Sequence, residues 1–297
     1  MMLRSLRAAL MAVLLVALLS APSFAQLESN LSSMAESYAT AYLQPLSSAL
    51  GASLNSAIFR SGNVPFVGLN FSLDINGVMV QFSDDDRTYS PTLPDGFSPV
   101  DAPTVIGDTA SVYSEGPAGV EIALPGGFDL DRLLTGVPQL TVGSVLGTRA
   151  VVRYVSLDLG DSEFGNFRLL GLGGQHSISR YLPGLPVDLA AGAFWQSLQL
   201  GDDLLTATAL HVDVTASKKF GMIISVEPYA SIGIDSFTME ASYTEETLGQ
   251  AVEIAFDRET NPHLTVGAGL NLPILKIHAE ANIAAVNGFA AGISFGI

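Results

Sequence analysis

Long segments in which every second residue is large and apolar restrict the fold of this chain more than any other feature. Phe289, Ile293, Phe295 and Ile297 share the odd positions of residues 289–297, and small or polar residues fill the even positions. Successive side chains of a β-strand point to opposite faces of the sheet. This segment is therefore predicted to form a strand with one apolar face.

The same alternation recurs upstream, in residues 275–284, 264–272, 224–235, 210–217 and 67–75. These segments exceed the roughly five or six residues most common in soluble strands, and most of them approach the roughly 9–11 residues of a tilted strand that crosses a bilayer. The sequence therefore predicts an all-β fold, a transmembrane antiparallel β-barrel. A soluble β-sandwich or a periplasmic barrel is the alternative, because the strands of both also alternate.

The expected number of strands depends on residues 66–82. Asn76-Gly77 is a strong hairpin signal, yet the apolar positions also change there from odd to even, as they would at a β-bulge. A hairpin would give an odd number of strands, whereas bacterial barrels have even numbers. We therefore expect one bulged strand over 66–82 and about 12 strands in all, with about 14 as the alternative.

Counting strands back from the C-terminus assigns each connection to one side of the membrane. The longest connections, 83–103 and 125–137, are expected outside the cell, as is typical of such barrels. The connection at 114–118 is expected in the periplasm. The last strand resembles the assembly signal of outer-membrane barrels, so the barrel assembly machinery and outer-membrane lipid are expected partners.

Residues 1–25 have the pattern of a secretory signal peptide. Arg4 and Arg7 precede an apolar core, and Ser23 and Ala25 supply the small residues before a cleavage site. The core is shorter than the about 20 apolar residues of a membrane-spanning helix. The expected localisation is the bacterial outer membrane after export.

Residues 26–62 are expected to form a helical N-terminal segment, followed by the barrel over 63–297. Apolar residues recur in it every three or four positions, which is typical of one helix face. Pro45 is expected to end or kink the first helix, giving helices over about 29–43 and 45–58. The segment is expected to plug the lumen or cover its periplasmic mouth, and the plug residues are Leu31, Met34, Tyr38, Tyr42 and Leu46.

Composition excludes several classes of protein. The chain carries 13 Lys and Arg against 29 Asp and Glu, a formal charge of −16, and so lacks the basic surface of a nucleic-acid binder. It has no cysteine, which excludes disulfides and thiolate metal sites. Its high apolar content and low charge exclude a disordered chain.

No enzyme active site is expected. The four histidines have no metal-ligand spacing along the sequence, so neither a metal nor a cofactor is expected. His176-Ser177 suggests a hydrolase, but adjacent strand residues face opposite ways and cannot form a catalytic pair. There is no nucleophile elbow and no phosphate-binding loop motif.

Polar residues on the other face of the strands are expected to line the lumen. They are Asp74, His211, Asp213, Glu227, Tyr229, Asp235, Lys276, His278 and Glu280. One interpretation is structural, since polar residues inside a barrel satisfy one another or water. The other is a charged constriction that favours cations, although Lys276 has the opposite sign.

Four segments carry a resemblance to a known family. They are the run LPGGFDL at 124–130 and residues 138–143, 147–154 and 174–178. These segments resemble an uncharacterised family of bacterial outer-membrane β-barrels of unknown function. More distantly, a helical lead before a barrel is similar to the long-chain fatty-acid transporters of the outer membrane. That resemblance implies an N-terminal hatch and an apolar binding pocket.

The function expected from the sequence is passive transport or binding of small or hydrophobic solutes, with residues 27–60 narrowing the lumen. The alternative is a non-conducting structural or interaction barrel whose outer loops meet partners. A transporter needs a continuous path through the lumen, which a structural barrel lacks.

Overall fold

The computed structural model describes residues 24–34, 36–158, 166–201, 204–245 and 250–296. Of the predicted signal peptide, residues 1–23 lie outside this range. The helices are α2 (Phe24–Ser32) and α3 (Glu36–Leu54), and short 3-10 turns are η1 (Asp84–Asp86), η2 (Pro117–Gly119) and η3 (Ser179–Tyr181). In the described part of the chain, no helix has both the length and the apolar character needed to span a membrane.

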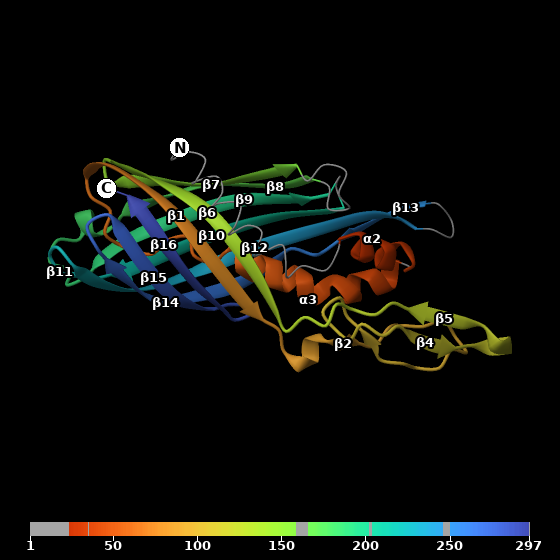
Figure 1. Cartoon of the computed structure of the whole chain (residues 1–297). Helices are drawn as coiled ribbons and strands as arrows, with labels where there is room; N and C mark the ends of the chain where they lie inside the picture. The colour runs from red at the N-terminus through yellow and green to blue at the C-terminus, as the bar shows by residue number, and fades with distance from the viewer. Residues whose placement is uncertain (1–23, 35, 159–165, 202–203, 246–249, 297) are drawn as a thin grey trace.

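Ten antiparallel strands of the described residues close into a barrel (Figure 1). They pair in chain order, and the last strand returns to the first. Their bounds are β1 (Val67–Gln81), β6 (Arg132–Val145), β7 (Thr148–Asp158), β8 (Asn166–Ser177), β9 (Asp188–Leu200), β10 (Leu205–Ser217), β12 (Ser225–Glu245), β14 (Glu259–Asn271), β15 (Leu275–Ile283) and β16 (Gly288–Gly296). The short strands β11 (Phe220–Gly221) and β13 (Gln250–Ala255) pair only with β12.

The prediction of about 12 strands, or 14, is therefore wrong. Residues between β1 and β6 were counted as two barrel strands, but they form separate hairpins instead. Strands β4 (Val112–Glu115) and β5 (Glu121–Leu124) pair with each other, as do β2 (Thr88–Tyr89) and β3 (Ala102–Pro103). Strands of four residues are too short to cross a bilayer. The connection at 114–118 consequently lies at the same end of the barrel as 83–103 and 125–137.

Residues 66–82 contribute one strand, as predicted, but without a bulge at Asn76-Gly77. The register of β1 with β6 and with β16 runs through both residues without a shift, and the irregularity lies between Gly68 and Phe71. The apolar positions change parity for another reason. The inward positions of β1 are polar at Asp74 and Asn76 and apolar further along.

The barrel has two distinct ends. The turn mouth is the end with the connections β6–β7, β8–β9, β10–β12 and β14–β15, and the loop mouth is the end with the other connections, including residues 82–131. These turns and loops alternate along the chain as the sequence predicted, except at 114–118. We refer to residues 82–131 as the cap.

The inward surface changes from polar near the turn mouth to apolar near the loop mouth. In β12, Ser231 and Asp235 give way to Phe237 and Met239, all of them buried. The other strands contribute further buried apolar residues to the loop-mouth half: Val78, Val80, Val137, Val155, Leu169, Leu198, Leu200, Leu205, Ala207 and Ala209. The lumen near the loop mouth can therefore hold an apolar element.

The outward surface is apolar across the middle of the strands. Ile232 and Ile234 of β12 are 69% and 57% exposed, and Val226 is half exposed. On the same strand, the outward positions beyond Ile234 are polar, and they include Glu240 and Ser242. Such an apolar band on the outside of a barrel fits contact with lipid rather than water.

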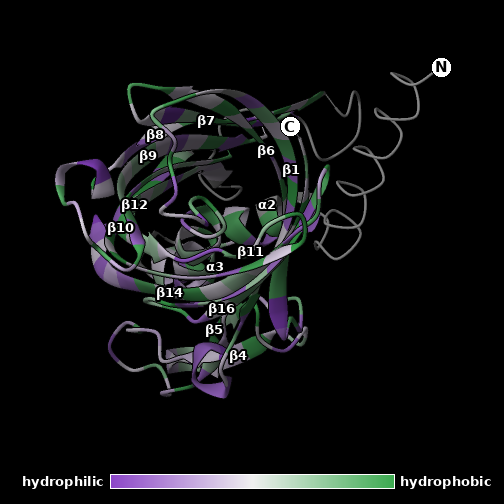
Figure 2. Ribbon diagram, turned by 90° about the vertical axis from the view of Figure 1, so that its left-hand side faces the viewer, coloured by the Kyte–Doolittle hydropathy of each residue, from purple (hydrophilic) through white to green (hydrophobic). Residues whose placement is uncertain are grey.

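Helices α2 and α3 lie inside the ring of strands (Figure 2). The expected boundary between two helices at Pro45 is wrong, because α3 continues from Glu36 through this residue to Leu54, and α2 ends at Ser32. Proline removes one backbone hydrogen bond. Burial of the neighbouring Tyr42 and Leu43 against the barrel wall offsets that loss.

Candidate functional site

The helices fill the loop-mouth half of the lumen. Leu31, Met34 and Tyr42 are each at most 2% exposed and pack against the apolar inner face, and Tyr38 and Leu46 lie at the edge of the same cluster. These side chains are the five that the sequence assigned to the plug. The packing is close, since a Cβ atom at Gly51 of α3 would lie 2.9 Å from the Phe237 ring.

The cap closes over the helices through the run LPGGFDL. The hydroxyl of Tyr42 donates to the carbonyl oxygen of Gly126 at 3.0 Å, and the amide of Asn30 donates to the same oxygen. Val105 of the cap donates its N–H to the carbonyl of Tyr42 at 2.9 Å, and Phe128 donates back to Val105. This motif, which carried the family resemblance, thus connects the cap to the plug.

Residues 55–66, here the strap, lead from α3 through the lumen to β1 at the turn mouth. Arg153 of β7 fixes the start of the strap, next to α3. Its guanidinium donates hydrogen bonds to the carbonyls of Leu54, Ser56 and Ala57 at 2.8–2.9 Å. Arg153 is fully buried, so each of these bonds forms away from bulk water. Ala57 has a left-handed backbone with φ 57°, which is strained for a residue other than glycine.

Other wall residues hold the strap along its length. The N–H of Ala57 donates to Glu280 at 2.9 Å, and the amide of Gln139 donates to the carbonyl of Ile58 at 3.1 Å. The Phe59 ring lies over Gly192, where a Cβ atom would be 2.3 Å from the ring. The strap is therefore fixed to several strands by contacts that are specific in direction.

A cavity of about 370 Å³ lies on the turn-mouth side of the strap and opens towards the turn mouth. The strap itself, from Ile58 to Ser61, forms the inner end of this cavity. Four basic side chains line it, namely Arg60, Arg149, Lys219 and Lys276, and two carboxylates, Asp74 and Glu227. In a chain of strongly negative charge, this cavity is locally positive.

Two of the six charged groups of the cavity form an ion pair with each other, and Glu227 is held by hydrogen bonds. Arg60 of the strap forms an ion pair with Asp74 at 2.8 Å and donates to His278 at 2.7 Å. Glu227 accepts hydrogen bonds from Ser61 at 2.5 Å and Ser217 at 2.9 Å. Lys276 makes no direct ion pair with any carboxylate among the described residues.

The predicted lumen residues all belong to the inner face, but they divide into two groups. Asp74, Glu227, Tyr229, Lys276 and His278 line the cavity. The others are buried further towards the loop mouth, and they are His211, Asp213, Asp235 and Glu280. Tyr229 connects the groups, because its hydroxyl donates to Glu280 at 2.7 Å. The structure thus brings together a cavity and a buried network rather than a single ring.

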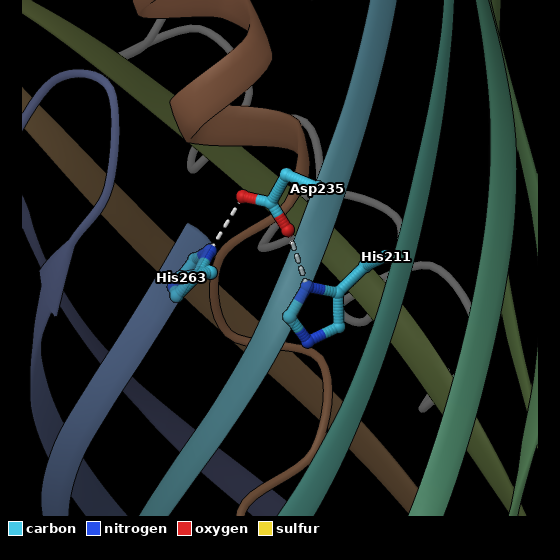
Figure 3. A group of neighbouring side chains, drawn as sticks. All are labelled: His211, Asp235 and His263. Carbon is cyan, nitrogen blue, oxygen red and sulfur yellow. Dashed lines mark hydrogen bonds and ion pairs between the residues drawn. The ribbon is translucent and has the colours of Figure 1, made fainter. Parts of the chain in front are cut away.

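The buried group includes a compact cluster of His211, Asp235 and His263 (Figure 3). Each histidine places its Nδ1 atom 2.6 Å from one oxygen of the Asp235 carboxylate. Sequence spacing missed His263 as a partner because the cluster forms across strands. His211 and Asp235 are direct register partners of β10 and β12, and His263 lies on the next strand, β14.

The sequence interpretation also missed three arginines that organise the lumen: Arg60, Arg149 and Arg153. Arg149 and Arg153 are four residues apart on β7, so they share one face, and Val151 between them is buried. An arginine on the inward face of a predicted strand is the signal that could have found them. Arg60 lies at the end of the segment predicted as helical, where the chain is extended.

The C-terminal strand presents its apolar face outwards. Phe289 is 54% exposed, Phe295 is 47% exposed and Ile293 is 36% exposed, and all three lie on β16. Ile297 lies outside the described residues.

Comparisons with known proteins place the chain in a family and give distant structural similarities. The profile of a family described as a family of unknown function, DUF6588, matches residues 3–297. No curated protein matches the chain. Among solved structures, the chain is similar to a bacterial polysaccharide outer membrane secretin, with 11% identity, a TM-score of 0.36 and coverage of 76% of this chain and 97% of that one.

Two further structures are similar at the same distant level. A loop-deletion mutant of OmpT, an outer membrane protein of Vibrio cholerae, shares 11% identity over 79% of this chain and 100% of its own, with a TM-score of 0.28. Salmonella typhi OmpF, solved with daunomycin, shares 7% identity over 77% of this chain and 97% of its own, with a TM-score of 0.19. These similarities concern the barrel fold alone.

Proposed function

We propose that this chain, which belongs to DUF6588, a family of unknown function, is an outer-membrane β-barrel that binds a small anionic solute inside its turn mouth. In this proposal the helical plug blocks transport until it moves. The observation that carries the proposal is that residues Ile58–Ser61 form the inner end of a basic cavity and also continue directly from the plug.

The lipid-facing band supports a position in the outer membrane. Exposed Ile232 and Ile234 would be costly in water as part of a continuous band, and they match the hydrocarbon zone of a bilayer. On this assignment the turn mouth faces the periplasm and the loop mouth faces outwards, as short turns and long loops do in related architectures.

The charge of the cavity favours an anion over a cation. Asp74 is neutralised by Arg60, and the remaining Glu227 faces Lys276, Lys219 and Arg149 around the same cavity. A volume of about 370 Å³ is at the lower end of the range for small-molecule sites. The cation-favouring constriction considered from sequence is not favoured at this cavity, because four basic side chains face two carboxylates there.

A ligand in the cavity would act directly on the strap. An anion that draws Arg60 towards it competes with Asp74 and His278, which now fix that side chain. Displacing Arg60 moves residues that lie next to Ala57, whose strained backbone is held by Arg153. Binding at the cavity and release of the plug are therefore coupled through the strap.

A second candidate is a non-conducting barrel that presents the cap to partners. The contacts of Tyr42 and Val105 favour it, because they connect the cap and plug into one unit at the loop mouth. The two candidates differ in whether the plug can move.

Conductance in planar bilayers tests the transport proposal. Arg153→Met removes the bonds to the strap while keeping much of the volume, and it should produce conductance steps that the native protein shows rarely. Ser53 of α3 and Thr135 of β6 have hydroxyl oxygens 2.5 Å apart, so Ser53→Cys with Thr135→Cys can cross-link the plug to the wall. In the Arg153→Met background, oxidation should stop the steps and reduction should restore them.

The absence of native cysteine makes this experiment specific. Ser53→Cys alone, in the same background, should not respond to oxidant. If Arg153→Met and a variant lacking residues 27–54 both migrate as folded barrels and remain silent, the transport proposal is wrong and the non-conducting barrel stands.

Ion selectivity tests the charge of the solute. The open Arg153→Met channel in a KCl gradient should prefer chloride, and Lys219→Gln with Lys276→Gln should reduce the permeability ratio by about twofold or more. Lys218→Gln is the matched control, since Lys218 adjoins Lys219 but does not line the cavity. A channel that prefers potassium would contradict anion binding.

A further inference from the structure

We propose that His211, Asp235 and His263 form a binding site for a divalent transition metal ion, with zinc as the representative cation. The three residues lie on adjacent strands β10, β12 and β14, and the Asp235 carboxylate lies between the two imidazoles with one oxygen directed at each (Figure 3). One ligand atom from each lies within 4.8 Å of the others. The proposal does not depend on the transport of an anion.

The donor set suits such an ion. Two imidazoles and a carboxylate are ligands of zinc in many proteins, with bond lengths of about 2.0–2.2 Å. The histidine Nδ1 atoms are now 2.6 Å from the carboxylate oxygens. Ligand atoms around a tetrahedral zinc ion are separated by roughly 3.3 Å, as these bond lengths imply. Each nitrogen–oxygen separation would therefore have to widen by about 0.7 Å to admit the ion, and the two histidine nitrogens, which lie within 4.8 Å of each other, would have to settle at a similar spacing.

The hydrogen bonds of His263 point independently to a cation. Asn282 donates its amide N–H to Glu280 at 3.1 Å, so its oxygen faces His263 Nε2 at 3.0 Å. Thr265 donates to the same oxygen, which fixes the amide in that orientation. His263 Nε2 must then carry hydrogen, and Nδ1, 2.6 Å from the Asp235 carboxylate, is the atom left to hold either a second proton or a metal ion. Either one would supply the positive charge that this carboxylate faces.

This arrangement is also the usual environment of a metal-bound histidine. Such a histidine donates its second ring N–H to an oxygen, which fixes its orientation, and Asn282 is that oxygen for His263. On the other side, His211 Nε2 lies 4.0 Å from Asp213. Within the described residues, Oδ1 of Asp213 is buried and has no hydrogen-bond partner. The two aspartates make the surroundings negative.

A fourth ligand has space beside Asp235. A small cavity of about 10 Å³ reaches this carboxylate and is lined by Asn55, Glu259 and Asn261. Its volume is about that of one water molecule. Both polar atoms of the Asn55 side chain are buried without a partner in the described part of the chain. Asn55 can therefore bind a water molecule that completes the coordination of the metal.

The proposed site would brace the strap. The Phe59 ring lies 6.3 Å from the His211 ring, centre to centre, and Asn55 is the first residue of the strap. An ion bound by three strands would fix His211 and thereby the surface on which Phe59 rests. Metal binding and plug stability would then rise together.

Metal uptake by the untagged, refolded full-length barrel tests the proposal. After treatment with a chelator, the protein should bind one zinc ion per chain by calorimetry. Cobalt added in place of zinc should give the visible spectrum of a tetrahedral nitrogen and oxygen site. Asp235→Asn and His263→Gln should weaken zinc binding by about tenfold or more. His176→Gln is the control, because His176 lies at the turn mouth and bonds to Tyr181 instead.

The outcomes are distinct. If the native protein binds neither zinc nor cobalt, or if the His263→Gln and Asp235→Asn variants bind zinc as tightly as His176→Gln does, the proposal is wrong and the cluster is an imidazolium–carboxylate pair only. X-ray absorption of the zinc-loaded native protein, which needs no variant to fold, should show two imidazole ligands. A zinc spectrum without imidazole would also overturn the site.

Discussion

Arg60 of the strap and Asp74 of β1 form an ion pair inside the lumen, with Nη2 and Oδ2 2.8 Å apart. Asp74 is fully buried, and its second oxygen accepts a hydrogen bond from Ser72 at 3.1 Å. The pair joins the segment that crosses the lumen to the first strand of the barrel. It is therefore one of the points at which the strap and the wall are directly coupled.

Removing both partners of this pair should cost less than the sum of the two single removals. Asp74→Ala leaves a guanidinium without its counter-ion, so the free energy of unfolding should fall by about 3 kcal/mol. In the double variant Arg60→Ala with Asp74→Ala, the free energy of unfolding should fall by less than the sum of the two single losses. Urea unfolding in lipid vesicles measures the three values. Strict additivity would show that the two side chains do not interact.

A charge placed on the outward face should be costly only within the apolar band. Ile232→Arg is expected to destabilise the barrel in lipid by about 2–4 kcal/mol, because the guanidinium enters the hydrocarbon zone. Glu240→Arg is the control, on the same face of β12 but beyond the band, and should have little effect. The free energies of unfolding of the two variants, measured after folding into lipid vesicles, provide the comparison. Equal stability of the variants would contradict the membrane position of β12.

Gly192 should not tolerate a side chain. A Cβ atom there would lie 2.3 Å from the Phe59 ring and 2.7 Å from Asp213, so Gly192→Ala should destabilise the folded barrel by about 1–3 kcal/mol. Gly269→Ala is the matched control, since its nearest neighbours are 3.9 Å away. The unfolding transitions of both variants provide the test. If Gly192→Ala unfolded with the same midpoint as the native protein, Phe59 would not pack against β9.

Tyr89 of the cap should ionise at unusually high pH. Burial raises the pKa of Tyr89 to about 12, and the neighbouring phenols of Tyr42 and Tyr38 add to the effect. The folded cap favours the neutral phenol, whose ordinary pKa is about 10. Its contribution to stability is thus complete below pH about 10 and is lost as the pH rises through about 12.

Ultraviolet titration of the native protein against Tyr89→Phe isolates this phenol. The difference in phenolate absorbance should appear near pH 12. A difference that appears near pH 10 would place Tyr89 in water rather than inside the cap.

The alternation of side chains was sufficient to predict the barrel, its two faces and most of its turns. The prediction failed where two different structures give the same sequence pattern. At Asn76-Gly77 the parity of apolar residues changes because the lumen itself changes from polar to apolar, and a bulge would produce the same sequence. Between β1 and β6, apolar hairpins that pair with themselves look like barrel strands until their length is known.

The candidate site was only partly predictable, for a physical reason. Inward carboxylates and histidines were visible in clean alternating strands such as β10 and β12. Arg149 and Arg153 were not, because β7 mixes basic and apolar residues on its inward face. The contact of His263 with Asp235 depends on the register of β12 with β14, which no local spacing encodes.

The pairing of β1 with β16 has a consequence for the movement of the plug. These strands are joined over nine register positions, and that joint closes the ring around α2, α3 and the strap. A closed ring offers these helices no sideways route, so the N-terminal segment can enter or leave only along the barrel axis. A plug that leaves through one mouth stays tethered to β1 by the strap, so the length of the strap limits how far the plug can travel and keeps it close enough to return.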